Sequence, residues 1–393
     1  MKHNKVLKLS LIVTVLSVLL FNACSPLREF GKSPVYEGAT KFNDQLPAND
    51  PLKKTVVIIA NNDGTEMFDM MAPYYLFNAT EKANVYIVAK NNSPIVVRKG
   101  FFILPQFTFA TIDSLGIKPD VIVIPFLSAA DSVHQDPVTV NWIKSHYIAD
   151  TKILSVCDGA ATAAATGIFD GKPITAHASD YAGIKAQFSK PLWMQNISVA
   201  NTGNLYSTAG VSNATEGSLM VVNDMFGPEV VRKVIENIGY PYLLPKIAHQ
   251  SKVFSFGDKV TVAKKIMIKG NKKIGLLLQD GINEFELAAI MDTYNRTFPK
   301  SLESFSAGDL PVKTKYGLTL IPTGKINGNK LDELHVINAH AFSKSEEAAF
   351  SADKSVRYHN FQKQYIIDEC LQRIRLEYGY KFENVVKLML DYN

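Results

Sequence analysis

A cysteine in the middle of the chain occupies a position suited to nucleophilic chemistry. The segment ILSVCDGAATAAATGIFDGK contains an apolar run that ends at Cys157, then Asp158 and Gly159, then an alanine-rich stretch that stops at Gly167. A strand that turns sharply into a helix would push the cysteine side chain out at the turn, as in a nucleophile elbow. The helix N-terminus and its free amides would favour a thiolate and could stabilise a developing oxyanion. The alternative is a buried cysteine that only ends a strand.

Four segments, in the same order, resemble the ThiJ/PfpI superfamily, which has the class-I glutamine-amidotransferase-like fold. The elbow is similar to members that read VCTGA or VCAG. The other three are DGTEMFDMMAP (63–73), GIFDGKPITAH (167–177) and STAGVSNATEGSLMVVNDMFG (207–227). The resemblance covers about residues 55–245 and is closest to the subgroup that also precedes helix-turn-helix domains in AraC-type regulators.

The resemblance implies roles for residues around the cysteine. Asp69, four positions before Pro73, corresponds to the acidic residue that meets the nucleophile, and His177 corresponds to a histidine that many members keep near it. Cys157 would then add as a thiolate to a carbonyl-like or similarly electrophilic carbon, while Asp69 or His177 moves the proton. The residues expected at the oxyanion site and pocket are Asp158, Gly159, Thr208, Ala209 and Gly210.

The residues themselves leave alternatives open. Asp158 directly follows the cysteine, and its negative charge should oppose thiolate formation unless it points away. Because that position is not a histidine, as it is in the protease-like branch of the family, peptidase activity is disfavoured. On chemistry alone, His177 could be structural, and Asp69 could be a first-turn helix acid that faces water.

Apolar strands alternate with helical stretches from residue 55 onward. Helical patterns cover 68–80 and 138–147. The alternation predicts an α/β fold, a parallel-sheet flavodoxin-like sandwich that binds ligands at the carboxyl ends of its strands. The β-branched runs typical of strands buried on both faces are TVVIIA (55–60), NVYIVA (84–89), DVIVIP (120–125) and TKILSVC (151–157).

A second, incomplete copy of this pattern appears when the chain is shifted by 217 residues. Asp69 then falls on Glu286, and KIGLLLQ (273–279) stands for the first strand. The shift becomes 213 for DELHVIN (332–338) and 152 for the helical pattern at 377–392, so about 61 residues are missing. The missing piece corresponds to the elbow, the histidine strand and the Ser-Thr-Ala-Gly segment.

This copy therefore lacks a nucleophile. Cys370 lies in a helical pattern with apolar spacing and is expected in the core. We expect the copy to pack on the first domain in place of the homodimer contact usual in the family, although a homodimer stays open. Its alternative role is to cover the first domain's pocket.

The N-terminus resembles that of a bacterial lipoprotein. A basic stretch precedes an apolar run over 9–21, and Ala23-Cys24 fits a lipobox, in which the cysteine is acylated. The alternative is an ordinary secretory signal. The predicted parts are a signal peptide (1–23), a tether (24–54), a ThiJ/PfpI-like domain (55–245), a linker that could hold a hairpin (246–271) and the degenerate repeat (272–393).

Composition excludes several classes of protein. Of the 393 residues, 47% are hydrophobic and 20% charged, which excludes disorder and coiled coil. The net charge of +5 includes three leader lysines, and no basic patch appears, so nucleic-acid binding is not expected. Without clusters at metal-ligand spacing or a phosphate-binding glycine loop, we expect no metal and no cofactor.

Two function classes follow. The first is a lipid-anchored enzyme on the periplasmic side of the bacterial envelope, which uses Cys157 on a small molecule. Reactions in the superfamily include isonitrile hydration, glyoxalase-like conversion of α-oxoaldehydes and amide hydrolysis. The second is a small-molecule binding or redox-sensing module that uses the same pocket without turnover.

Overall fold

The computed structural model describes residues 34–38, 46–97, 100–128, 135–325, 330–337, 355–359 and 364–393. Cys24, the signal peptide and much of the tether lie outside these residues, so the expected lipid anchor stays a prediction. Within the described residues, no helix combines the length and the apolarity needed to cross a membrane.

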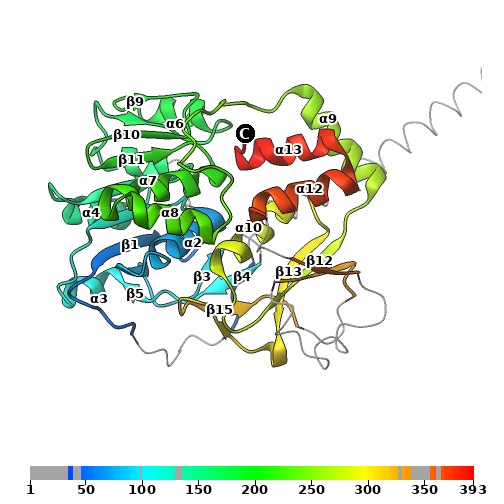
Figure 1. Cartoon of the computed structure of the whole chain (residues 1–393), viewed down its shortest axis with the longest axis horizontal. Helices are drawn as coiled ribbons and strands as arrows, with labels where there is room; N and C mark the ends of the chain where they lie inside the picture. The colour runs from blue at the N-terminus through cyan, green and yellow to red at the C-terminus, as the bar shows by residue number, and fades with distance from the viewer. Residues whose placement is uncertain are drawn as a thin grey trace, which may run out of the picture.

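A seven-stranded sheet forms the centre of the first half, in the order β10-β11-β7-β6-β1-β2-β5 (Figure 1). Neighbouring strands are parallel except β10 and β11. Four of the strands confirm the predicted ones, and the α/β class with a mostly parallel sheet is confirmed. The strands are Lys54–Ala60 (β1), Ala83–Ala89 (β2), Phe107–Thr108 (β5), Val121–Ile124 (β6), Lys152–Ser155 (β7), Val199–Thr202 (β10) and Leu205–Thr208 (β11).

Helices cover both faces of this sheet because alternate strand side chains enter different cores. Val56 and Ile58 of β1 lie in one hydrophobic cluster, and Val57 and Ile59 lie in another. The first cluster is covered by Met67–Asn78 (α2), Ala214–Phe226 (α7) and Pro228–Asn237 (α8). The second is covered by Phe109–Ser114 (α3), Pro137–His146 (α4), Gly159–Ala165 (α5) and Tyr181–Gln187 (α6). The loops at the carboxyl ends of β1, β6 and β7 therefore meet at one edge of the sheet.

The second half holds a smaller parallel sheet, in the order β13-β12-β16-β17. The order β13-β12-β16 parallels β2-β1-β6, and α10 follows β12 as α2 follows β1. The strands are Lys273–Leu278 (β12), Ser301–Ser306 (β13), Glu333–Val336 (β16) and Ser355–Tyr358 (β17). The helices are Glu284–Asn295 (α10), Ile366–Tyr378 (α12) and Tyr380–Leu390 (α13).

The two halves share a second sheet and one core. The strands Ile95–Val97 (β3), Phe101–Ile103 (β4), Val312–Lys313 (β14) and Thr319–Pro322 (β15) form an antiparallel sheet in the order β14-β15-β4-β3. Ile103 pairs directly with Leu320 across it. Helix α2 packs on α10 (Figure 1), with the rings of Phe68 and Phe285 5.2 Å apart. In both pairs the two residues are 217 positions apart, which is the shift found from the sequence.

A similar hydrogen bond from a backbone amide to an aspartate occurs beside the third strand of each half. The carboxylate of Asp120 accepts a hydrogen bond from the Thr55 amide at 2.9 Å. Asp332 accepts the same bond from the Lys273 amide at 2.8 Å. In each sheet, an aspartate before the third strand thus ties it to the start of the first strand.

The linker contains no hairpin, although the sequence left a hairpin open there. Residues 246–271, all described, instead form helix α9 (Phe256–Lys264) and the π-helical turn η2 (Lys265–Lys269). Ser255 and Asp258 form a reciprocal capping box at the start of α9, which sets the chain in the helical path.

Candidate functional site

Cys157 lies at a sharp turn between β7 and α5. Its φ is +55°, a left-handed conformation that is uncommon for a residue with a side chain. Gly159 follows closely against β6, because a Cβ there would lie 2.1 Å from the carbonyl oxygen of Ile124. Only glycine fits this approach, so the local sequence specifies the turn.

The thiol of Cys157 is buried, with 4% of the residue exposed. Burial raises the pKa of Cys157 well above its ordinary value, and the nearby carboxylates of Asp158, Asp69 and Glu66 raise it further. A hydrogen bond from the Asp158 amide opposes the shift. The structure thus corrects the expectation that the helix N-terminus favours a resting thiolate. Desolvation and acidic neighbours outweigh the amide.

Asp69 lies in the first turn of α2 and is fully buried, so it is not a surface acid. Its Oδ2 accepts a hydrogen bond from the Phe126 amide at 3.1 Å, and its own amide donates to the Glu66 carboxylate at 3.0 Å. Its Oδ1 is buried and has no hydrogen-bond partner among the described residues. Burial, followed by the charge of Glu66, raises the pKa of Asp69 well above its ordinary value. Both causes favour the protonated form of Asp69.

Arg296, just after α10, brings a cation from the second half to this group of acids. Its guanidinium lies 3.6 Å from Glu66, forms an ion pair with Asp292, and donates to the Met389 carbonyl at 3.0 Å. Burial alone would lower the pKa of Arg296, but Asp292, Glu66 and the sulfur of Cys157 raise it. Burial and the charge of Asp292 raise the pKa of Glu66 to about 8, although Arg296 opposes this.

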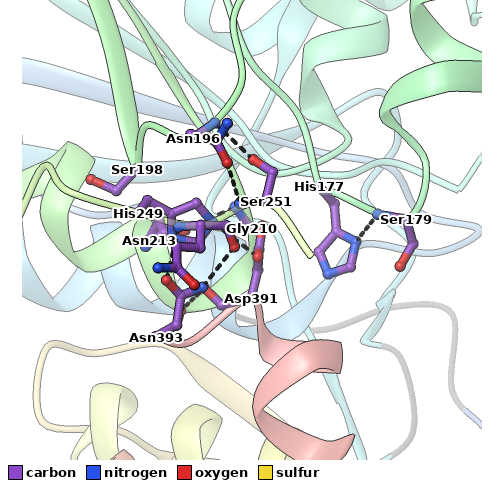
Figure 2. Close-up of polar contacts among 12 residues, drawn as sticks. His177, Ser179, Asn196, Ser198, Gly210, Asn213, His249, Ser251, Asp391 and Asn393 are labelled. Atoms are coloured by element: carbon purple, nitrogen blue, oxygen red, sulfur yellow. Dashed lines mark hydrogen bonds and ion pairs between the residues drawn. The ribbon is translucent and has the colours of Figure 1, made fainter. Parts of the chain in front are cut away.

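His177 is buried and lies within the influence of the same guanidinium. Its Nδ1 accepts a hydrogen bond from the Ser179 amide at 3.2 Å (Figure 2) and lies 3.7 Å from the carboxylate of Asp180. Burial lowers the pKa of His177, Asp391 and Asp180 oppose the shift, and Arg296 adds to it. The imidazole is therefore expected to be neutral at pH 7. Its Nε2 has no hydrogen-bond partner within the described part of the chain.

The other predicted pocket residues divide into two groups. Thr208 touches the elbow, since its hydroxyl accepts a hydrogen bond from the Cys157 amide at 3.3 Å. The amides of Gly159, Ala209 and Gly210 are engaged elsewhere: they donate to the Val156 carbonyl, the Ser198 carbonyl and the Asn213 side chain. The Asp158 amide lies beside the sulfur of Cys157, to which it donates a hydrogen bond.

Asp391, at the end of α13, brings a second charged group from the second half. It adopts a left-handed φ of +55°, and its Cβ would lie 2.0 Å from a Cβ at Gly210. Its Oδ1 lies 3.0 Å from Nε2 of buried His249 (Figure 2), whereas its Oδ2 is buried without a hydrogen-bond partner among the described residues. A cavity of about 270 Å³ adjoins this pair; residues of both halves line it, including Glu216, Tyr240, His249, Asp368, Lys387 and Tyr392.

Asp69 and Cys157 were identified from the sequence, but Glu66, Arg296 and Asp391 were not. Glu66 lies inside the quoted segment 63–73 and caps the helix that carries Asp69. Arg296 falls opposite Ala79 at the shift of 217, a difference in charge that the sequence does show. Among the described residues, no group of three or more histidine, cysteine or acidic side chains is arranged to hold a metal ion.

Comparisons with known proteins bear on the first half. Residues 53–223 match the DJ-1/PfpI family, so this part of the chain is a DJ-1/PfpI family domain. Isonitrile hydratase from Pseudomonas putida is 23% identical over 175 residues, 44% of this chain and 74% of that protein. Drosophila melanogaster DJ-1beta has 20% identity and a TM-score of 0.42 over 48% of this chain and 100% of that chain. A ThiJ/PfpI family protein from Pseudomonas syringae has 19% identity and a TM-score of 0.42 over 51% of this chain and 84% of that chain.

Proposed function

We propose that the DJ-1/PfpI family domain of residues 53–223 is a cysteine-dependent enzyme that acts on a small carbonyl, amide or isonitrile-type substrate. The observation that carries this proposal is the elbow: Cys157, at a φ of +55°, lies within electrostatic reach of the buried carboxyl group of Asp69. Backbone strain of this kind clusters at functional sites. The similarity to isonitrile hydratase supports the choice of substrate class.

In the proposed reaction, the sulfur of Cys157 forms a bond to the electrophilic carbon. Protonated Asp69 gives its proton to the substrate, and the thiol proton returns to the Asp69 carboxylate, so the number of protons is conserved. The Asp158 amide stabilises negative charge that develops on the substrate. With an isonitrile, water then adds to the same carbon, the nitrogen takes up a proton, and the carbon–sulfur bond breaks to release a formamide and the thiol. With an amide, the carbon–nitrogen bond breaks first and the amine leaves with a proton, which gives a thioester. With an α-oxoaldehyde, proton transfer from the hemithioacetal carbon to the neighbouring carbonyl carbon, through an enediol, gives the thioester. Water hydrolyses either thioester to a carboxylic acid and the thiol. Neutral His177 is the alternative acceptor of the thiol proton.

The protonation states of the acids around Cys157 depend on one another. When ionised, Asp69 and Glu66 raise the pKa of Cys157, but burial raises the pKa of both carboxyl groups and so favours their protonated forms. When Asp69 and Glu66 carry protons, two of the three charges that oppose a thiolate disappear. Such a coupled set can exchange one proton between sulfur and carboxyl without taking one from solvent, which suits proton transfer in a closed site.

The second half is proposed to be a degenerate copy of the domain that closes this site. The matching strand order and the α2–α10 contact support it. A further parallel lies in the two helix pairs, which are joined by glycines with similar conformations: Gly227 at φ +84° and Gly379 at φ +91°. Arg296 and Asp391, both from this half, supply the buried charges described above.

Turnover tests the proposed enzyme. Small isonitriles, α-oxoaldehydes and amides are offered to the full chain, to Cys157→Ser and to the matched control Cys370→Ser. Cys370 is fully buried in α12, outside the site. We expect at least one substrate class to be converted by the wild type and by Cys370→Ser but not by Cys157→Ser. Conversion by Cys157→Ser at the wild-type rate would refute the role of the cysteine.

The second candidate is a small-molecule binding or redox-sensing module without turnover. The observation that favours it is the raised pKa of Cys157 together with its 4% exposure, since a buried, neutral thiol is a poor nucleophile at rest. The same burial and raised pKa oppose reaction with peroxide, so they favour binding over redox sensing. No turnover of any substrate, together with saturable binding of a small molecule that slows alkylation of Cys157, would favour this candidate.

The envelope location is also proposed from the sequence alone. A lipid on Cys24 would hold the folded part near a membrane, with residues 25–54 as the tether. Metabolic labelling with an alkyne fatty acid in a bacterial host, comparing the wild type with Cys24→Ser, tests this location. Equal labelling of both would contradict it.

A further inference from the structure

Exposed apolar side chains gather on the segment that joins the two halves. Of the 21 large hydrophobic side chains that are exposed in the described part of the chain, nine lie between residues 242 and 268. Scattered exposed apolar residues are ordinary, but such a concentration marks an interaction surface. The nine are Tyr242, Leu243, Leu244, Ile247, Val253, Phe256, Val260, Met267 and Ile268.

Helix α9 and the turn η2 order part of this surface into one stripe. Phe256, Val260, Ala263 and Met267 recur at the spacing that places residues on one side of a helix, and all four are exposed. We name these four residues the α9 outer face. Phe256 alone is 82% exposed.

The opposite side of α9 is fixed to the protein. Val262 and Ile266 are buried in the core shared by the two halves, and α9 packs on α13. In Figure 1, α9 lies at the outer edge of the molecule beside α13. The helix therefore has two apolar sides, of which only one is used inside the molecule.

Lysines flank the α9 outer face. Lys259 and Lys264 lie on either side of the stripe and are exposed, and Lys252 and Lys269 are exposed near its two ends. Between residues 241 and 271 the chain has six lysines and one acidic residue, Asp258. Asp258 is occupied by its hydrogen bonds to Ser255.

We propose that the α9 outer face lies on an anionic phospholipid membrane, with its apolar side chains among the headgroups and its lysines against lipid phosphates. Apolar side chains bordered by lysines are typical of helices that lie in a membrane interface. The charge also argues against a second copy of the chain, because a two-fold contact through this face would bring the two lysine rims together. The contact is additional to the proposed lipid at Cys24 and does not depend on the proposed enzyme activity.

The test places a fluorescent probe in the stripe. Phe256→Trp in the full chain is compared with Leu115→Trp, a matched control at an apolar position that is 53% exposed on the first half. Vesicles contain phosphatidylcholine with or without phosphatidylglycerol, and brominated phosphatidylcholine serves as a quencher. Any N-terminal anchor would bring both variants to the vesicle equally. A difference in fluorescence between the two tryptophans therefore reports insertion of the α9 outer face itself.

We expect the tryptophan at 256 to shift to the blue and to be quenched on anionic vesicles, and the tryptophan at 115 to do neither. Added salt should reverse most of the effect. In the Phe256→Trp background, replacing Lys259 and Lys264 with Glu should weaken vesicle binding at that site about tenfold or more. Equal behaviour of the two tryptophans, equal insertion into neutral vesicles, or a concentration-dependent blue shift without vesicles would each overturn the proposal; the last would indicate a second copy.

Discussion

Replacing Glu66 with Gln should stabilise the protein at neutral pH, which is the opposite of what a buried ion pair would show. Glu66 is 3% exposed, and burial raises its pKa from 4.5 to about 8 even though Arg296 lies 3.6 Å away. The folded state thus binds the Glu66 proton more tightly than the unfolded state. The wild type therefore loses stability as the pH rises from 4.5 towards 8, at about 1.4 kcal/mol per pH unit.

In the Glu66→Gln variant, the side-chain oxygen can still accept the hydrogen bond from the Asp69 backbone amide. The glutamine has no proton to lose, so the stability of the variant does not fall with pH in this way. We expect the free energy of unfolding of Glu66→Gln to exceed that of the wild type by about 3 kcal/mol at pH 7, and by less than about 1 kcal/mol at pH 5. Urea unfolding at half-unit steps of pH measures the difference. The matched control is Glu229→Gln, whose side chain is 72% exposed beside Arg232; it should stay within about 1 kcal/mol at every pH.

The refuting result is a clear reversal of sign. If Glu66 were ionised and paired with Arg296, the substitution would leave a buried guanidinium partly uncompensated and would cost about 3–5 kcal/mol. Parallel pH curves for the wild type and Glu66→Gln would likewise contradict a protonated Glu66.

Three further predictions concern the elbow and its neighbours. Gly159→Ala should destabilise the fold by about 1–3 kcal/mol in urea unfolding, because the new methyl group would meet the backbone of β6; an unchanged midpoint contradicts this. Asp158→Asn should lower the pKa of Cys157, measured as faster iodoacetamide modification at pH 7 in a variant that lacks Cys24 and Cys370. An unchanged rate would show that Asp158 does not act on the thiol. Asp391→Asn should lower the pKa of His177 in an NMR titration, since the Asp391 charge raises it; a rise would contradict this placement of charge.

The first half was largely predictable because its signals are local. Four β-branched runs gave β1, β2, β6 and β7, since such side chains suit strands buried on both faces. The turn at Cys157 followed from small residues next to a strand end, and the structure gives the physical reason in the close approach of Gly159 to β6. The raised pKa of Cys157 was predictable only in part, from the charge of the adjacent Asp158. Burial, the largest cause, and the charges of Asp69 and Glu66 act on the thiol only after α2 has packed against the sheet.

The composition of the site depends on contacts distant in sequence. Arg296 reaches Glu66 across 230 residues, and Asp391 reaches His249 across 142. No local pattern encodes such pairs. The sequence left a hairpin open in the linker because its valines and lysines suit either a strand or a helix. The Ser255–Asp258 cap starts helix α9 there instead.

The mass of the chain trapped during turnover tests the proposed role of Cys157 most directly. The full chain carrying Cys370→Ser is mixed with a substrate that it converts, quenched with acid and analysed as intact protein and as peptides. We predict an added mass equal to the substrate on the peptide that contains Cys157, and none in a variant that also carries Cys157→Ser. Turnover without any adduct, at a rate that survives loss of Cys157, would contradict the proposed chemistry.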